Sequence, residues 1–153
     1  MTNSSITWRD LASGLTADQI DSLTRQEQQF GNHADADLIL FDLAHDHVEG
    51  NQVDAQFAHV PIPAGVEHVD HWTQTDSGWR REIQGRCWTV AGVTVWIGGH
   101  QYADGRVEAF MSIDSHTTEL TADDGWNVMA ALAQAVEEVS RLSGSADSLG
   151  SRG

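Results

Sequence analysis

The sequence predicts an α+β fold, with N-terminal helices, a four-stranded antiparallel β meander and a C-terminal helix packed on the sheet. Helix-capping patterns and amphipathic periodicity occupy residues 5–60 and return near the C-terminus, whereas branched and aromatic residues separated by glycine turns fill the middle. Prolines in residues 61–65 mark a connector between the two patterns, because proline cannot continue a helix. We therefore expect one domain over residues 1–153, with residues 66–142 holding the meander and the last helix, and residues 143–153 a disordered tail.

Two capping boxes predict the first two helices. In a capping box, a threonine and an acidic or amide residue three positions later satisfy each other's backbone N–H groups. Thr7 with Asp10 predicts a short first helix, and Thr16 with Gln19 predicts a second one that ends near Phe30.

A third helix is expected over residues 35–57, and its two sides differ. Apolar residues recur on one side, as in a helix that packs on a core, while the opposite side is an acidic stripe. The apolar side comprises Leu40, Phe41, Ala44 and Val48, and the acidic stripe comprises Asp35, Asp42, His45, Asp46 and Glu49.

Segments rich in branched and aromatic residues predict the strands of the meander. Glycine-containing turns at residues 76–78 and 103–105 connect two of the pairs, since glycine supplies the positive φ that tight turns require. The four expected strands are residues 66–74, 79–84, 87–98 and 106–114.

Alternation along these strands predicts the main core face of the sheet. Successive side chains of a strand point to opposite faces, so every second residue shares one face. Thr121 caps a last helix over residues 122–142, whose apolar stripe should cover that face. The core face is expected to comprise Val93, Val95 and Ile97 of the third strand and Val107, Ala109, Met111 and Ile113 of the fourth.

The second face of the sheet carries the interaction candidates Trp88, Trp96 and Phe110. If residues 87–98 form one unbroken strand, Trp88 and Trp96 share this face, and Phe110 lies on the matching side of its neighbour. Either the N-terminal helices cover this face, or it is an exposed aromatic patch of the kind that marks an interface. We favour coverage, because those helices need a surface for their own apolar stripes.

Composition excludes several classes of partner. The formal net charge is -15, and all eight basic residues are arginine. Such a chain would repel nucleic acid and anionic membranes, so direct binding to either is not expected, and a protein partner is. No apolar run is long enough for a membrane span, and the N-terminus lacks the pattern of a signal peptide. We therefore expect a cytoplasmic protein.

Residues that could carry chemistry are few. Asp42, His45, Asp46 and Glu49 share one helix face and are weak candidates for a divalent metal, although such a charged stripe is usually only solvated. Cys87, the one cysteine, is expected to be a buried, inert thiol in a strand. The sequence lacks phosphate-binding, dinucleotide-binding and nucleophile-elbow motifs, so we expect no enzyme and no cofactor.

Short phrases of the sequence resemble a known group of proteins. They include Thr-Trp-Arg-Asp-Leu-Ala from Thr7, Gln-Tyr-Ala-Asp-Gly-Arg-Val from Gln101 and Leu-Thr-Ala-Asp from Leu120. Together they resemble small uncharacterised proteins of actinobacteria and their phages, over about residues 7–142. That family has no assigned reaction, so the resemblance implies an origin and assigns no functional residue.

Three functional hypotheses follow from the sequence. The leading one is a non-enzymatic acidic accessory protein, encoded by a phage or mobile element, that binds a host macromolecule through its acidic helices or its aromatic sheet face. The second is a metal- or small-ligand-binding protein or enzyme built on histidines and carboxylates. The third is a structural component that associates with itself; the sequence pattern leaves the oligomeric state open.

Overall fold

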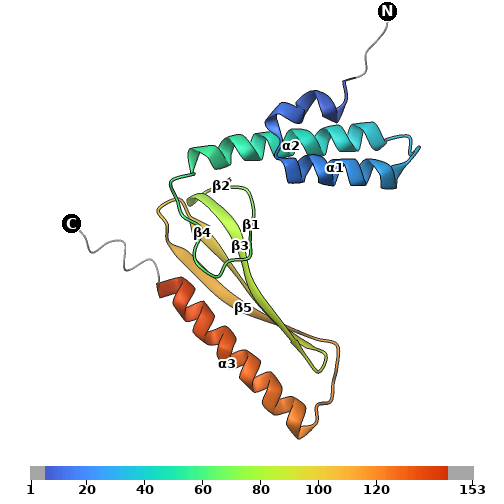
Figure 1. Ribbon diagram of the computed structural model, residues 1–153. Helices are drawn as coiled ribbons and strands as arrows, with labels where there is room; N and C mark the ends of the chain where they lie inside the picture. The colour runs from blue at the N-terminus through green and yellow to red at the C-terminus, as the bar shows by residue number, and fades with distance from the viewer. Residues whose placement is uncertain (1–5, 145–153) are drawn as a thin grey trace, which may run out of the picture. The chain divides into compact units, whose positions relative to one another are not determined.

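The structure is a computed structural model that describes residues 6–144. Its contacts divide the chain into two compact units, residues 1–56 and 57–153. Helices make up the first unit, and an antiparallel sheet followed by a helix makes up the second (Figure 1). The predicted α+β class is confirmed, whereas the expected single domain stays a prediction.

The first unit contains the 3₁₀ helix η1 (Trp8–Gly14) and the α-helices α1 (Ala17–Phe30) and α2 (Ala36–Gln56). The predicted caps form: the Asp10 carboxylate accepts the Thr7 N–H at 2.7 Å, and the Gln19 side chain accepts the Thr16 N–H at 2.9 Å. Apolar residues from all three helices meet in one core. Its buried members are Trp8, Leu23, Leu40 and Ala44.

An ion pair joins the start of the first unit to α1. Arg9 donates to both carboxylate oxygens of Glu27, at 2.6 and 2.5 Å, and the indole N–H of Trp8 donates to Glu27 at 3.4 Å. The Arg9 hydrogen bond is the main reason that the pKa of Glu27 lies below its ordinary value. The pair is exposed, so its contribution to stability is small.

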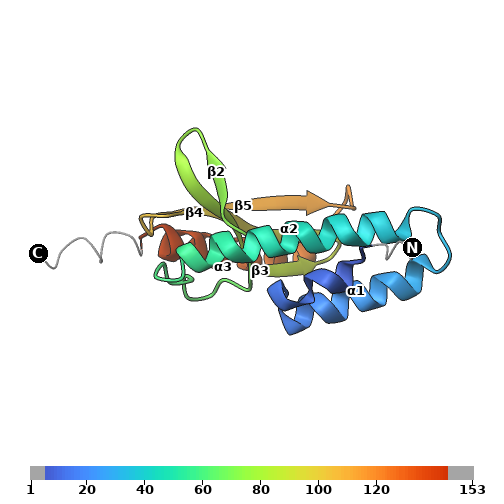
Figure 2. The same ribbon diagram turned by 90° about the horizontal axis from the view of Figure 1, so that it is seen from above.

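The second unit is built on an antiparallel sheet with the strand order β1-β3-β4-β5, in which β2 also pairs with β3. Figure 2 shows the β2–β3 hairpin standing away from the remainder of the sheet. The helix α3 (Ala122–Gly144) packs on β3, β4 and β5. The strands are β1 (His68–Val69), β2 (Thr73–Thr75), β3 (Gly78–Val90), β4 (Val93–Tyr102) and β5 (Val107–Ser115).

Two of the four predicted strands are wrong. Residues 66–74 do not form one strand but contain β1 and β2, which residues 70–72 separate. Residues 87–98 are not continuous, because the chain reverses at Ala91 and Gly92 and Val90 pairs with Val93. Both turn residues have positive φ, 49° and 77°, as a two-residue type I′ hairpin requires. The predicted turns at residues 76–78 and 103–105 do connect β2 to β3 and β4 to β5.

Two glycines also differ from expectation. The predicted strand ends at Gly98, but Gly98 and Gly99 both lie inside β4 and pair with both neighbouring strands. An irregularity lies in β3, where the register shifts between Gln84 and Cys87. A bulge of this kind adds one residue to one strand and strengthens its twist.

The core of the second unit lies between α3 and one face of the sheet. Val93, Val95 and Ile97 are buried there, as predicted. The register also places the four predicted β5 residues on this face, since Val95 pairs with Ile113 and Ile97 with Met111. The α3 residues that complete the core are Val128, Ala131, Leu132, Ala135, Val139 and Leu142.

Local hydrogen bonds hold the start of α3 and the proline connector that precedes the sheet. Thr121 caps α3 as predicted: its hydroxyl accepts the Asp124 N–H at 3.1 Å and donates to the Asp124 carboxylate at 2.7 Å. At the connector, the buried Gln101 side chain accepts from Arg81 at 2.7 Å and donates to the Pro61 carbonyl at 2.8 Å. The proline connector is thereby tied to the sheet.

The structure bears on two further expectations. The tail was expected from residue 143, but Ser143 and Gly144 belong to α3, and residues 145–153 lie outside the described part of the chain. Within residues 6–144, none of the helices combines the length and apolar character that crossing a membrane would need.

Candidate protein-binding surface

The face of the sheet opposite α3, here called the open face, carries large aromatic side chains. Because side chains alternate along β4, the residues between Val95 and Gln101 that point away from α3 are Trp96, Gly98 and His100. Phe110 of β5 pairs with Gly98 and points to the same side. These four residues form a continuous aromatic patch across two neighbouring strands.

The rings of the aromatic patch are arranged around the glycine. Trp96 and Phe110 meet edge to face, with ring centroids 6.1 Å apart and planes at 72°, the preferred geometry of an aromatic pair. The His100 and Phe110 centroids are also 6.1 Å apart. A Cβ atom on Gly98 would lie 2.7 Å from the Trp96 ring and 2.9 Å from the Phe110 ring. Glycine therefore lets both rings rest on the β4 backbone.

The aromatic patch is accessible. Trp96 is 38% exposed and Phe110 is 43% exposed, although both are among the residue types that gain most from burial. Within the described part of the second unit, α3 packs on the opposite face of the sheet. The expectation that the N-terminal helices cover the open face concerns the placement of one unit on the other and stays a prediction.

Trp88, the third interaction candidate, is not part of the aromatic patch. It pairs with Val95 and so points toward α3, where its indole N–H donates to Gln134 at 3.1 Å. The physical reason is the turn at residues 91–92, which reverses the strand and exchanges the faces of the residues before it. Cys87 takes the position opposite Trp96 instead, and it is exposed rather than buried as expected.

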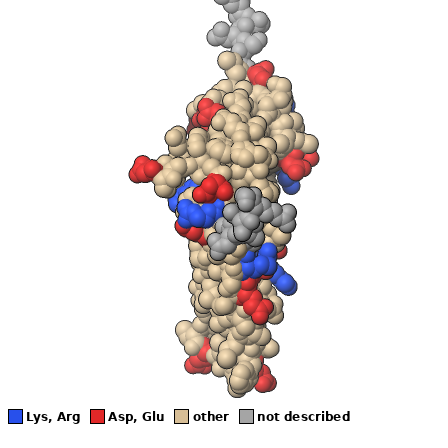
Figure 3. Space-filling view, turned by 90° about the vertical axis from the view of Figure 1, so that its left-hand side faces the viewer, with Lys and Arg blue, Asp and Glu red and all other residues tan. Residues whose placement is uncertain are grey.

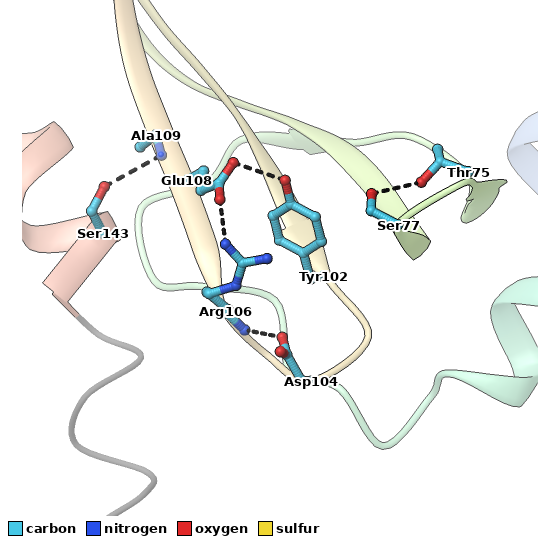
Figure 4. Close-up of polar contacts among 8 residues, drawn as sticks. All are labelled: Thr75, Ser77, Tyr102, Asp104, Arg106, Glu108, Ala109 and Ser143. Atoms are coloured by element: carbon cyan, nitrogen blue, oxygen red, sulfur yellow. Dashed lines mark hydrogen bonds and ion pairs between the residues drawn. The ribbon is translucent and has the colours of Figure 1, made fainter.

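Charged groups border the aromatic patch on β5. Glu108, which pairs with His100, accepts the Tyr102 hydroxyl at 2.8 Å and forms an ion pair with Arg106 (Figure 4). The Tyr102 hydrogen bond, followed by Arg106, lowers the pKa of Glu108. Glu82 of β3 pairs with His100 on the other side of β4. Two carboxylates therefore flank the aromatic rings at this end.

The charge on the surface is not confined to the aromatic patch. Figure 3 shows one side of the molecule, on which acidic and arginine side chains lie in mixed groups separated by uncharged surface. On α2 the predicted acidic stripe is exposed from Asp42 to Glu49. With a net charge of -15, the chain presents carboxylates both beside the aromatic rings and on a helix of the other unit.

The metal candidates come together only in part. His45, Asp46 and Glu49 can bring one ligand atom each within 4.8 Å of one another, and all three are exposed on α2. Asp42 is two turns from Glu49, roughly 10 Å along the helix axis, so these two cannot hold one ion together. Three exposed ligands from one helix leave most of a coordination shell to water, and exposed acidic groups of this kind are common without a metal.

A shallow cavity lies beside β2 and β3. Its lining mixes acidic, basic and hydroxyl groups, so it offers a small polar ligand no uniform environment. The lining residues are Asp70, His71, Thr73, Thr75, Arg80 and Glu82. The cavity therefore favours no particular ligand, whereas the aromatic patch groups large rings on one face of the sheet.

Sequence reasoning identified Trp96 and Phe110 but not Gly98 or His100. The sequence contains a signal for both, because residues 96, 98 and 100 are two apart and so point to the same face of a strand.

A comparison of the chain with family models, curated proteins and solved structures finds no match. The resemblance to actinobacterial and phage proteins therefore stays a prediction.

Proposed function

We propose that this chain is a non-enzymatic binding protein, and that the aromatic patch docks on a protein partner with a basic surface. The observation that carries the proposal is the exposed edge-to-face pair of Trp96 and Phe110 over Gly98. Large aromatic side chains dominate the binding energy of protein interfaces when they enter a pocket of the partner. A matching partner presents an apolar pocket for these two rings.

Charge supports a basic partner. Glu82 and Glu108 lie next to the rings, and the whole chain carries a net charge of -15. Complementary charge at the rim of an interface raises the association rate and excludes wrong partners more than it adds affinity. The aromatic rings would thus supply the affinity, and the carboxylates would select a cationic surface on the partner.

Affinity capture with paired variants tests the proposal. Untagged protein immobilised through its amino terminus is exposed to an actinobacterial lysate, in parallel with the Trp96→Ala/Phe110→Ala variant. The control is Leu38→Ala, which removes an exposed apolar side chain from α2. The partner is then titrated against each protein by calorimetry.

We expect the double variant to raise Kd by at least about tenfold, the scale of an interface hot spot, and the control to leave it unchanged. The Kd of the wild type should also rise with salt, because the rim is charged. Circular dichroism confirms that each variant is folded. A partner that binds wild type and double variant equally would overturn the proposal.

A further inference from the structure

We propose that a second copy of this chain pairs with the free edge of β5, so that two sheets join across a two-fold axis. The two edges of the sheet differ. On the β3 side the edge consists of β1 and β2, two and three residues long, and very short edge strands are a common way to protect a sheet edge. β5 is nine residues long and contains neither proline nor a basic residue. Its two charged residues, Glu108 and Asp114, lie on the open face, and an edge of this length without proline or lysine is a template for another strand.

Hydrogen bonds identify which backbone groups of β5 are free. The Tyr102 N–H donates to the Arg106 carbonyl, so the backbone of Arg106 faces β4. The Ala109 N–H instead donates to the Ser143 hydroxyl of α3, and so faces away from β4 (Figure 4). Because this direction alternates along a strand, Met111 and Ile113 also turn their N–H and C=O groups away from β4. Among the described strands, only β4 pairs with β5.

An apolar surface adjoins these free groups. Met111 and Ile113 are 40% and 56% exposed, although their side chains lie on the same face of the sheet as the core. On α3, Met129 and Val136 are 57% and 49% exposed.

Helical spacing places Met129, Ala133 and Val136 on the side of α3 that also carries Ser143, which touches β5. These residues therefore border the free edge. They form, with the two β5 residues, an edge strip without a charged side chain: Met111, Ile113, Met129, Ala133 and Val136.

The absence of charge favours a second copy over a basic partner. A basic protein finds no carboxylate on the edge strip, whereas the aromatic patch and α2 offer several. Two copies, each with a charge of -15, repel one another wherever carboxylates meet. The edge strip lets a second acidic chain approach without that contact.

The edge strip is also complementary to itself. In an antiparallel pair with Ser112 on the two-fold axis, Met111 of each copy lies opposite Ile113 of the other, and both residues exchange backbone hydrogen bonds. The α3 helices then meet through Met129 and Val136. A two-fold interface uses the same residues on both sides, which a single strand edge with one adjoining helix can supply.

Sedimentation velocity on the full chain tests the dimer. We expect the dimer fraction to rise with protein concentration, and Ile113→Lys to raise the dimer Kd by at least about tenfold, because lysine on an edge strand opposes pairing. Ile62→Lys, at an exposed isoleucine elsewhere in the second unit, is the matched control and should dimerise like the wild type. Trp96→Ala, which changes the aromatic patch on β4 and not the paired strand, should dimerise too, and this separates the inference from the proposed function.

A disulfide between the two copies tests the register of the paired β5 strands, independently of how stable the dimer is. In a Cys87→Ser background, Ser112→Cys places two thiols across the axis, where Cα atoms of a non-hydrogen-bonded pair are about 4.5 Å apart, within disulfide range. Asp114→Cys, two residues along on the same face, lies opposite Phe110 of the other copy and should not cross-link. The proposal is overturned if the protein stays monomeric at every concentration, even where hydrogen exchange shows protected Met111 and Ile113 amides. It is also overturned if the two cysteine variants cross-link equally.

Discussion

The two faces of the sheet in the second unit are made by the same strands and differ in burial. On β4, Val93, Val95 and Ile97 are buried beneath α3, while the intervening Trp96 is exposed on the open face. Trp96 is itself a large apolar side chain, so the hydrophobicity of a single residue does not tell which face it occupies. The difference teaches that burial by α3 makes one face a core, while the aromatic side chains of the other face stay partly exposed.

Substitutions at two adjacent residues, one on each face of the sheet, should show the difference between the faces most strongly. Ile97→Ala removes a fully buried side chain, and we expect it to lower the free energy of unfolding by about 2–5 kcal/mol. Trp96→Ala should cost about 1 kcal/mol, the order of one aromatic pair, because the ring is already part-exposed. Urea denaturation followed by circular dichroism measures both. Equal losses would mean that the open face is as much a core as the α3 face.

The adjacent glycines sharpen the comparison at the level of the backbone. A Cβ atom on Gly99 would lie 2.6 Å from the Glu108 carbonyl oxygen and 3.0 Å from the Ala109 Cα, so β4 and β5 must separate. We expect Gly99→Ala to destabilise the unit by about 1–3 kcal/mol. Gly98→Ala meets only the rings of the aromatic patch, which can turn toward solvent, and it should cost less while changing tryptophan fluorescence. The reverse order of stability would contradict this account.

Acidification should produce the smallest effect in this comparison, and within the sheet it acts on Glu108 of the open face. The pKa of Glu108 is lowered first by the Tyr102 hydroxyl and then by Arg106. A lowered folded-state pKa means that the carboxylate stabilises the fold above its ordinary pKa, and that this contribution is lost as pH falls through the folded value. Carboxyl NMR titration should show Tyr102→Phe moving the Glu108 pKa back toward its ordinary value. An unchanged pKa in that variant would show that the hydrogen bond does not matter.

The sequence predicted most helices well because their signals are local. Thr16 with Gln19 and Thr121 with Asp124 form the expected caps, and α2 begins and ends within one residue of its predicted bounds. The sheet was harder to predict, as one turn shows. Alanine rarely adopts the positive φ seen at Ala91, so the alternating pattern did not predict that the chain turns back there.

That single missed turn explains the error in the candidate surface. Reversal through two residues gives Trp88 the face of Val95 and gives Cys87 the face of Trp96. Trp96 and Phe110 were unaffected, because their shared face depends only on positions within β4 and β5 and on the correctly predicted turn between them. The role of Gly98 depends on how two rings lie across neighbouring strands, which no single stretch of sequence contains.

The order of elements in the second unit has a consequence for protein synthesis. β3, β4 and β5 are consecutive and pair through short turns, so a nascent chain can form this hairpin array as soon as residue 115 is available. The helix that covers Val93, Val95 and Ile97 is translated later. Until α3 is made, the core face of the sheet is uncovered, so we expect the nascent chain to be most prone to aggregation in that interval.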